Sequence, residues 1–316
     1  MSTFLRAIVC AVMLSVASQG AEQTRVVLVV GAPGTDEYEK MFTEWRDRIL
    51  AACKAGDVDV VAIGGETASE TPDRQMLQQA LMERSDSKQL WLILLGHGTF
   101  DGKTARFNLR GPDVSAAELA EWLDEVPCPV AIVNCSSASG PFLERLAREQ
   151  RVVVTAARSG YEHNFARFGD FFSRSLADLE ADLDKDDQVS LLEAFLFASR
   201  RVEEFYSDEN RLATEHALID DNGDGRGTSA DWFQGVRLAK QAKEATQSPD
   251  GTLAHQIHLV LSTQERQLSA EAIARRNELE QQLTALRKRK DTIPADVYYR
   301  GVEAIGLELA QIYQAL

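Results

Sequence analysis

A histidine and a cysteine each follow a short apolar run in this sequence. His97 comes after Leu90–Leu95, and Cys135 comes just after the next such run, Val130–Val133. If the two runs are neighbouring parallel strands, their carboxyl ends meet at one edge of a sheet, where ligands and catalytic groups collect. A thiol beside an imidazole can carry out nucleophilic acyl transfer. The two residues together therefore favour a cysteine hydrolase.

The residues around this pair bear on the same chemistry. Gly98 lets the backbone approach a substrate closely, so its N–H can donate to a developing oxyanion. Pro141 begins a helix soon after Cys135, and a thiol near a helix amino end and a histidine has a lowered pKa. Taken alone, His97 is more often a structural strand cap and Cys135 a small buried hydrophobe. Their place on consecutive strands is what favours a catalytic pair.

Short apolar, β-branched runs alternate with helical patterns over the first half of the chain. The runs are Val26–Val30, Val58–Ile63, Leu90–Leu95, Val130–Val133 and Val152–Thr155. Helices are expected between them at 35–54, 69–86, 115–125 and 141–149. Strands this apolar are typical of a sheet buried on both faces. The pattern predicts an α/β fold, a three-layer α/β/α sandwich with a mainly parallel sheet.

The pattern changes after the fifth run. Further elements are expected as helices over Phe168–Leu183, Leu191–Tyr206 and near Asp231–Ala245, and as a sixth strand over His255–Leu261. Residues 263–316 are predicted to form a C-terminal helical hairpin with a break at Pro294. Its apolar seam is expected to pack on itself or on the rest of the chain, with self-association as the alternative.

The order of these strands, helices and motifs resembles the caspase–legumain clan of cysteine peptidases, most closely its legumain-like bacterial members. The resemblance covers roughly residues 25–215 and implies a caspase-like catalytic domain, for which we expect the bounds 22–262. It implies His97 as general base, Cys135 as nucleophile, and the N–H groups of Gly98 and Cys135 as the oxyanion hole. Asn134 departs from the small residue that this clan usually has before the cysteine.

The segment after the fifth strand is where this clan builds its specificity pocket. The candidate substrate-binding residues in it are Ser159, Glu162, Asn164 and Asp170. Asp36 and Glu39, after the first strand, could face the same cleft. An acidic pocket would favour a basic side chain before the scissile bond. The phenylalanines of this segment are expected to pack in the core.

Two acidic segments match the twelve-residue calcium loop of EF-hands, in which carboxylates, hydroxyls and one carbonyl surround a hard cation with oxygen atoms. In the first, 182–193, the candidate ligands are Asp182, Asp184, Asp186, Gln188, Ser190 and Glu193. In the second, 220–231, they are Asp220, Asn222, Asp224, Arg226, Thr228 and Asp231. Asp187 replaces the usual turn glycine of the first loop but tolerates the left-handed conformation. We expect calcium to order loops that flank the cleft, and no cofactor for catalysis.

Composition and the N-terminus restrict location and partners. The chain has 316 residues and a formal charge of −15, which argues against nucleic acid or an anionic membrane surface as a partner. Residues 1–21 resemble an export signal, because Arg6 precedes a short apolar core and small residues follow it. We expect an exported protein, periplasmic or extracellular, with no stable membrane insertion after cleavage. Cys53 and Cys128 could then pair, and two unpaired buried thiols are the equal alternative.

The leading hypothesis is an exported, calcium-binding cysteine endopeptidase that cleaves a peptide or protein substrate through a thioester. The alternative is a catalytically silent relative that binds peptides or calcium and assembles through its hairpin. A thiol esterase using the same residues is a third hypothesis.

Overall fold

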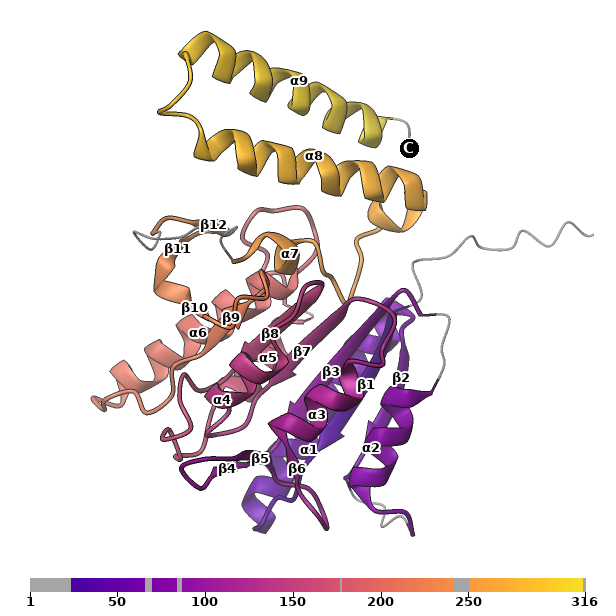
Figure 1. The fold of residues 1–316 in the computed structure, drawn as a ribbon, viewed down its shortest axis with the longest axis vertical. Helices are drawn as coiled ribbons and strands as arrows, with labels where there is room; N and C mark the ends of the chain where they lie inside the picture. The colour runs from indigo at the N-terminus through magenta and orange to yellow at the C-terminus, as the bar shows by residue number, and fades with distance from the viewer. Residues whose placement is uncertain (1–23, 66–69, 84–86, 177, 241–249, 315–316) are drawn as a thin grey trace, which may run out of the picture.

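A seven-stranded sheet lies at the centre of the molecule in a computed structural model (Figure 1). The structure describes residues 24–65, 70–83, 87–176, 178–240 and 250–314. Five strands are parallel: β1 Thr24–Val30, β2 Asp59–Ile63, β3 Gln89–Leu95, β7 Val130–Asn134 and β8 Arg151–Thr155. Two short antiparallel strands, β9 Leu218–Asp220 and β10 Thr228–Ser229, extend it beyond β8. The order is β10-β9-β8-β7-β3-β1-β2.

Helices cover both faces of this sheet and make two separate apolar cores. One core lies beneath α1 Asp36–Gly56, α5 Phe168–Ser175 and α6 Leu191–Asp208. The other lies beneath α2 Asp73–Met82, α3 Ala116–Leu123 and α4 Gly140–Leu146. Along β3, Trp91 and Ile93 enter the first core and Leu92 and Leu94 the second, which explains the unbroken apolar run. The predicted three-layer α/β/α sandwich with a mainly parallel sheet is confirmed.

Smaller elements lie at the two ends of the sheet. A three-stranded sheet of β4 Gly98–Phe100, β5 Ala105–Phe107 and β6 Val114–Ser115 follows the carboxyl end of β3. The remaining elements are η1 Ala230–Trp232, β11 Phe233–Gln234, β12 Arg237–Leu238, α7 Thr252–His255, η2 Glu265–Gln267, α8 Ala270–Lys288 and α9 Ala295–Gln314. The hairpin of α8 and α9 lies at the end of the sheet opposite β4–β6 (Figure 1).

Three expectations about the second half of the chain are wrong. His255–Leu261 is not a strand of the sheet: α7 ends at His255, and the segment makes one isolated bridge, between His258 and Ser190. The position beside β8 is taken instead by β9. The helix expected near Asp231–Ala245 is a 3₁₀ turn followed by β11 and β12, up to residue 240. The helix expected over Phe168–Leu183 ends at Ser175.

The hairpin is attached to the sandwich through a buried ion pair. Arg276 of α8 is 5% exposed and pairs with Glu265, which is 3% exposed. Tyr313 of α9 donates its hydroxyl to the same carboxylate at 2.7 Å. Gln256 donates to the carbonyl of Asn277 at 3.0 Å. These contacts fix both helices to the segment that follows α7.

Cys53 and Cys128 are both free thiols, as the second alternative expected, but only Cys53 is buried and Cys128 is partly exposed. Cys53 lies in the core beneath α1, whereas Cys128 packs against the core on the other face of the sheet. Burial raises the pKa of Cys53 to about 11. The predicted export signal, 1–21, lies outside the described residues. Across the described segments, every helix is too short or too polar to cross a membrane.

Candidate functional site

His97 lies directly after β3 in a pocket of aromatic rings. Its ring makes edge contacts with Tyr38, Phe42 and Phe165, at centroid distances of 4.6, 5.2 and 5.8 Å. Nε2 lies 3.2 Å from the carbonyl oxygen of Pro33. Because a carbonyl only accepts, Nε2 carries the proton and Nδ1 is left as a base. Burial lowers the pKa of His97, so the ring is neutral at pH 7.

The register of β3 and β7 orders the residues that follow the two strands. Leu94 pairs with Asn134, where the ladder ends. Counting on in the same register sets Cys135 level with Leu95 and Ser137 level with His97. Cys135 therefore lies two residues deeper along the sheet than the histidine.

Contacts at the strand ends agree with this register. The N–H of Gly98 donates to Oγ of Ser137 at 3.4 Å, and that hydroxyl donates to the carbonyl of Gly98 at 3.2 Å. A Cβ on Gly98 would lie 2.2 Å from the Ser137 carbonyl oxygen, so only glycine permits this approach. The chain turns sharply straight afterwards, at Ala138, whose φ is +53°. Ser137 is thus the hydroxyl beside the His97-Gly98 backbone.

Cys135 has the opposite environment from the one expected. Its side chain is fully buried beneath α1 and α5, among residues such as Trp45. Its N–H donates to the carbonyl of Leu94 at 2.9 Å and is therefore not an oxyanion donor. Burial, and secondarily the charge of Glu215, raise the pKa of the Cys135 thiol. The predictions of a lowered pKa and of a Cys135 oxyanion N–H are both wrong.

The carboxylate of Glu215 contributes to the raised pKa of the Cys135 thiol. Glu215 is 3% exposed, and its carboxylate accepts the N–H groups of Arg167, at 2.9 Å, and Phe168, at 3.0 Å. It thus caps the amino end of α5, the helix that covers Cys135. Burial raises the pKa of Glu215 above its usual value. A second carboxylate, on Glu162, anchors the loop that leads into this helix.

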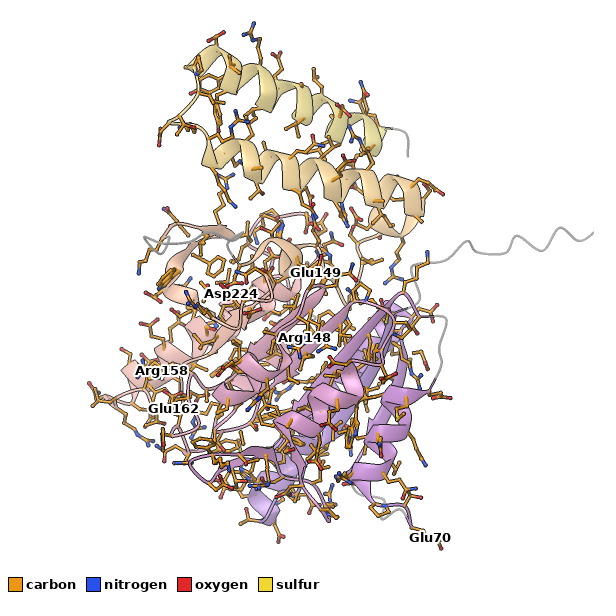
Figure 2. All side chains as sticks on the ribbon, viewed as in Figure 1. Glu70, Arg148, Glu149, Arg158, Glu162 and Asp224 are labelled. Atoms are coloured by element: carbon orange, nitrogen blue, oxygen red, sulfur yellow. The ribbon has the colours of Figure 1, made fainter. Side chains whose placement is uncertain are left out.

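Glu162 and Asp170, the acids of the expected pocket, are both held by cations. Glu162 contacts His216 Nδ1 at 2.6 Å and Arg158 at 3.2 Å; Figure 2 shows Arg158 and Glu162 together. Asp170, on α5, accepts from Arg48 at 2.6 Å and from Arg174 at 2.9 Å. These pairs neutralise both carboxylates within the fold, so an acidic pocket built from them is not formed.

The other expected pocket residues make separate contacts or are exposed. Ser159 accepts the N–H of Tyr161 at 3.3 Å, within its own loop. Asn164 and Asp36 are exposed. Glu39 pairs with Arg110 at 3.5 Å. Phe168 and Phe172 are buried in the core, as expected.

The first acidic loop, 182–193, has the form expected of a cation site. Asp182, Asp184 and Glu193 each offer an oxygen within 4.8 Å of the others. Asp182 accepts the N–H of Asp187 at 3.1 Å, and Asp187 has a φ of +65°, the left-handed conformation predicted for it. Glu193, which is 1% exposed, accepts the N–H of Leu183 at 2.7 Å.

The other candidate ligands of this loop, Asp186, Gln188 and Ser190, form hydrogen bonds within the protein. Asp186 accepts the side-chain amide of Gln188 at 2.8 Å, and burial with the neighbouring charges raises its pKa to about 6. Gln188 also accepts the N–H of Ser262 at 3.2 Å. The Ser190 hydroxyl forms a capping box with Glu193 at the start of α6.

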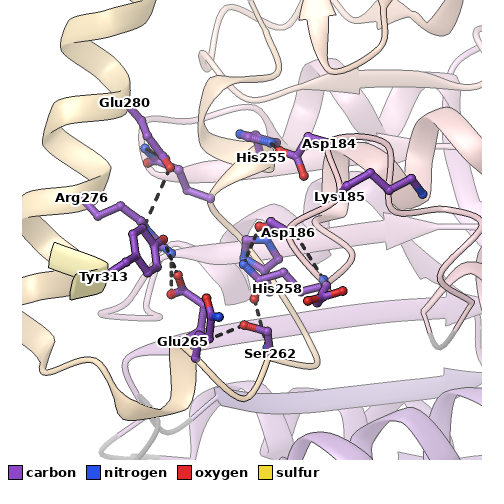
Figure 3. A pocket seen from close by; sticks show the side chains of 14 residues that line it. Asp184, Lys185, Asp186, His255, His258, Ser262, Glu265, Arg276, Glu280 and Tyr313 are labelled. Atoms are coloured by element: carbon purple, nitrogen blue, oxygen red, sulfur yellow. Dashed lines mark hydrogen bonds and ion pairs between the residues drawn. The ribbon is translucent and has the colours of Figure 1, made fainter. Parts of the chain in front are cut away.

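A polar cavity of about 430 Å³ joins this loop to the hairpin (Figure 3). Asp184 and His255 both line this cavity, and Oδ2 of Asp184 lies 2.9 Å from Nε2 of His255. On the far side, Arg276 and Tyr313 converge on Glu265. The loop and the hairpin therefore line the same cavity.

The second acidic loop is only partly assembled. Asp220 is fully buried, whereas Asp224 is exposed and accepts the N–H of Arg226 at 2.8 Å. Asn222 accepts the N–H of Asp224 at 2.8 Å. Asp231 points elsewhere and pairs with Lys240 at 2.6 Å. The structure does not bring this expected last ligand to the others.

Asp250, which the sequence pattern missed, lies beside this loop instead. It is 4% exposed and accepts the N–H of Asp221 at 3.0 Å and the hydroxyl of Thr228. Burial is the main cause of raised pKa values in this cluster, about 6 for Asp220 and Asp221 and about 7 for Asp250. The charges of the neighbouring aspartates add to each shift.

Both loops lie far from His97, so the expectation that they flank the cleft is wrong. β9 runs antiparallel to β8, which carries the second loop to the amino ends of the parallel strands. There Gly223 packs on Arg148 and Glu149, which precede β8, and Figure 2 shows them near Asp224. The first loop lines a cavity together with the hairpin, which lies at the same end of the sheet (Figure 1).

Comparisons with known proteins give only distant similarity. No protein-family model and no curated protein matches the sequence. The chain is similar to the solved structure of the Drosophila initiator caspase Dronc, with 11% identity and a TM-score of 0.44, over 66% of this chain and 84% of that one. It is similar to caspase-1 from Spodoptera frugiperda, with 13% identity and a TM-score of 0.40, over 63% and 85% of the two chains. The chemistry of the site is accordingly inferred from this chain's own residues.

Proposed function

We propose that this protein hydrolyses peptide bonds at the ends of β3 and β7, with His97 as general base and the Ser137 hydroxyl as nucleophile. The observation that carries this proposal is the contact of Ser137 Oγ with the Gly98 backbone, directly after His97. A base, a hydroxyl opposite it in the strand register and a backbone N–H donor are the parts that acyl transfer requires.

The reaction follows from these parts. Rotation of the Ser137 side chain releases its bond to the Gly98 carbonyl and lets His97 Nδ1 accept the hydroxyl proton. Oγ then bonds to the substrate carbonyl carbon, and the oxyanion accepts from the Gly98 N–H. The imidazolium gives its proton to the leaving amine, and water repeats the sequence to release the acid. The Pro33 carbonyl holds the ring through Nε2.

The thiol mechanism predicted from the sequence remains the second candidate. It needs Cys135 to reach His97, but burial raises the pKa of this thiol, and α5 covers it. Movement of α5 would be required before each turnover. The Ser137 hydroxyl, although its residue is only 4% exposed, already contacts the backbone of Gly98, next to His97.

The test is cleavage of a fluorogenic peptide library by the full chain and by three variants. Loss of cleavage in Ser137→Ala and His97→Ala, with retention in Cys135→Ala, is the expected result. Ser136→Ala is the matched control, because that hydroxyl is bonded to Asn134 Oδ1 at 2.6 Å rather than to Gly98. A fluorophosphonate probe should label Ser137, and labelling should disappear in His97→Ala.

Other outcomes identify the alternatives. Loss of cleavage in Cys135→Ala with retention in Ser137→Ala would establish the cysteine dyad instead. Cleavage of esters but not peptides would indicate an esterase. Absence of cleavage and of labelling, with saturable peptide binding, would favour the catalytically silent relative.

We also propose that loop 182–193 binds calcium. Three converging carboxylate oxygens, from Asp182, Asp184 and Glu193, support this assignment. Calcium should raise the melting temperature of the full chain, and Glu193→Gln should remove most of that increase. An equal increase in Glu193→Gln would refute the site.

Export and self-association are the remaining proposals from the sequence. Cleavage near residues 18–21 on secretion, seen by N-terminal sequencing, would test the first. The exposed apolar residues of α9, including Leu307 at 59% and Tyr299 at 62%, support the second. Sedimentation of the full chain and of Leu307→Lys would test it, and a monomer at high concentration would refute it.

A further inference from the structure

We propose that Asp250 completes a divalent cation site with Asp220 and the loop Asp220–Asp231, in the place that the loop pattern gives to Asp231. Asp250 lies outside the twelve-residue pattern. The proposal is independent of the hydrolase, because this loop is at the opposite end of the sheet from His97.

An incompletely satisfied carboxylate points into the loop. Asp220 is fully buried, and its Oδ1 accepts the N–H of Gly223 at 3.0 Å. Its Oδ2 is also buried and has no hydrogen-bond partner among the described residues. A buried carboxylate oxygen without a partner is costly, whereas a bound cation would satisfy it.

Asp250 is held beside the loop by the loop's own groups. Its Oδ1 accepts the N–H of Asp221 at 3.0 Å, and its Oδ2 accepts the hydroxyl of Thr228. Thr228 is one of the predicted ligands, so this bond places the Asp250 carboxylate beside one of them. Each carboxylate oxygen retains lone pairs that can bind a cation.

Asp231, the expected last ligand of the second loop, is directed away from the other candidate ligands. The side chain of Asp231 is 64% exposed and pairs with Lys240. In contrast, Asp220, Asp221 and Asp250 form no ion pair with a basic side chain in the part of the chain that the structure describes. Asp221 accepts the N–H of Ala254, so the carboxylates left for a cation are those of Asp220 and Asp250, whose oxygen atoms are of the kind that calcium prefers.

The experiment measures calcium binding by titration calorimetry on the full chain, after treatment with chelator. The Glu193→Gln substitution removes calcium binding by the first loop, and this variant serves as the background. We expect this background to bind one calcium ion. Adding Asp250→Asn should weaken binding by about tenfold or more, since removing a ligand costs at least as much as removing a residue that orients one. Adding Asp231→Asn should leave the affinity unchanged.

Three results would overturn the proposal: no calcium binding by the Glu193→Gln background, unchanged affinity after Asp250→Asn, or lost affinity after Asp231→Asn. Circular dichroism checks that each variant folds. If the Asp250 variant does not fold, Asp220→Asn in the same background decides the point, and retained affinity there would refute the site. Terbium luminescence gives a second readout of the same binding.

Discussion

The N–H group of Gly98 lies 3.4 Å from Oγ of Ser137, across the gap between the ends of β3 and β7. This contact makes Ser137 the neighbour of the His97-Gly98 backbone, while Cys135 is covered by a helix. The proposed chemistry depends on that difference. Variants of these residues and pH profiles of cleavage can distinguish the proposed serine mechanism from a thiol mechanism.

Cleavage should remain active at mildly acidic pH. A general base must be neutral, and burial lowers the pKa of His97 from its ordinary 6.5. The rate constant kcat/KM should therefore rise through a midpoint below that value and be level at neutral pH. The measurement is a pH profile of kcat/KM. A midpoint above 6.5 would contradict the assignment of the base.

Gly98→Ala should abolish cleavage. The new methyl group would lie 2.2 Å from the Ser137 carbonyl oxygen and 2.8 Å from the Ser136 hydroxyl, so the strand ends must separate. A displacement of about 1 Å at a reacting group costs about 100-fold in rate. Gly306→Ala is the control, because that position, in α9, has nothing within 4 Å. Wild-type activity in Gly98→Ala would show that the close approach is not required.

Cys135 should resist alkylation in the native protein. Its thiol is fully buried, and burial together with Glu215 raises its pKa, so little thiolate is present at pH 7. Cys128, which is partly exposed, should react with iodoacetamide first, as followed by mass spectrometry. Cys53, Cys128 and Cys135 should all react after denaturation. Preferential native labelling of Cys135 would instead favour the cysteine dyad.

Arg276→Ala should loosen the hairpin without affecting catalysis. The substitution leaves the buried Glu265 without its ion-pair partner, which costs about 3 to 5 kcal/mol. Arg275→Ala, which removes exposed pairs with Glu278 and with Glu308 of α9, should cost much less, because exposed ion pairs are screened by solvent. Urea unfolding and limited proteolysis measure the difference. Equal stability of the two variants would show that the ion pair does not fasten the hairpin.

Several features of the fold were predictable from local patterns. The apolar runs became the five parallel strands, because a strand buried on both faces needs apolar residues throughout. His97-Gly98 was correctly expected at a strand end. The positive φ of Asp187 followed from the preference of aspartate for that conformation. The short β9 was missed because three residues carry too little periodicity.

The sequence alone determined the layered α/β architecture and the edge where His97 lies, because both depend on local periodicity and on the direction of successive strands. The tertiary structure decided which residue lies beside the His97-Gly98 backbone, since packing across the sheet sets the register and places Ser137, rather than Cys135, against Gly98. It also decided that Asp250, rather than Asp231, lies by the second acidic loop. Contacts between residues this far apart in the chain arise only when the core has formed.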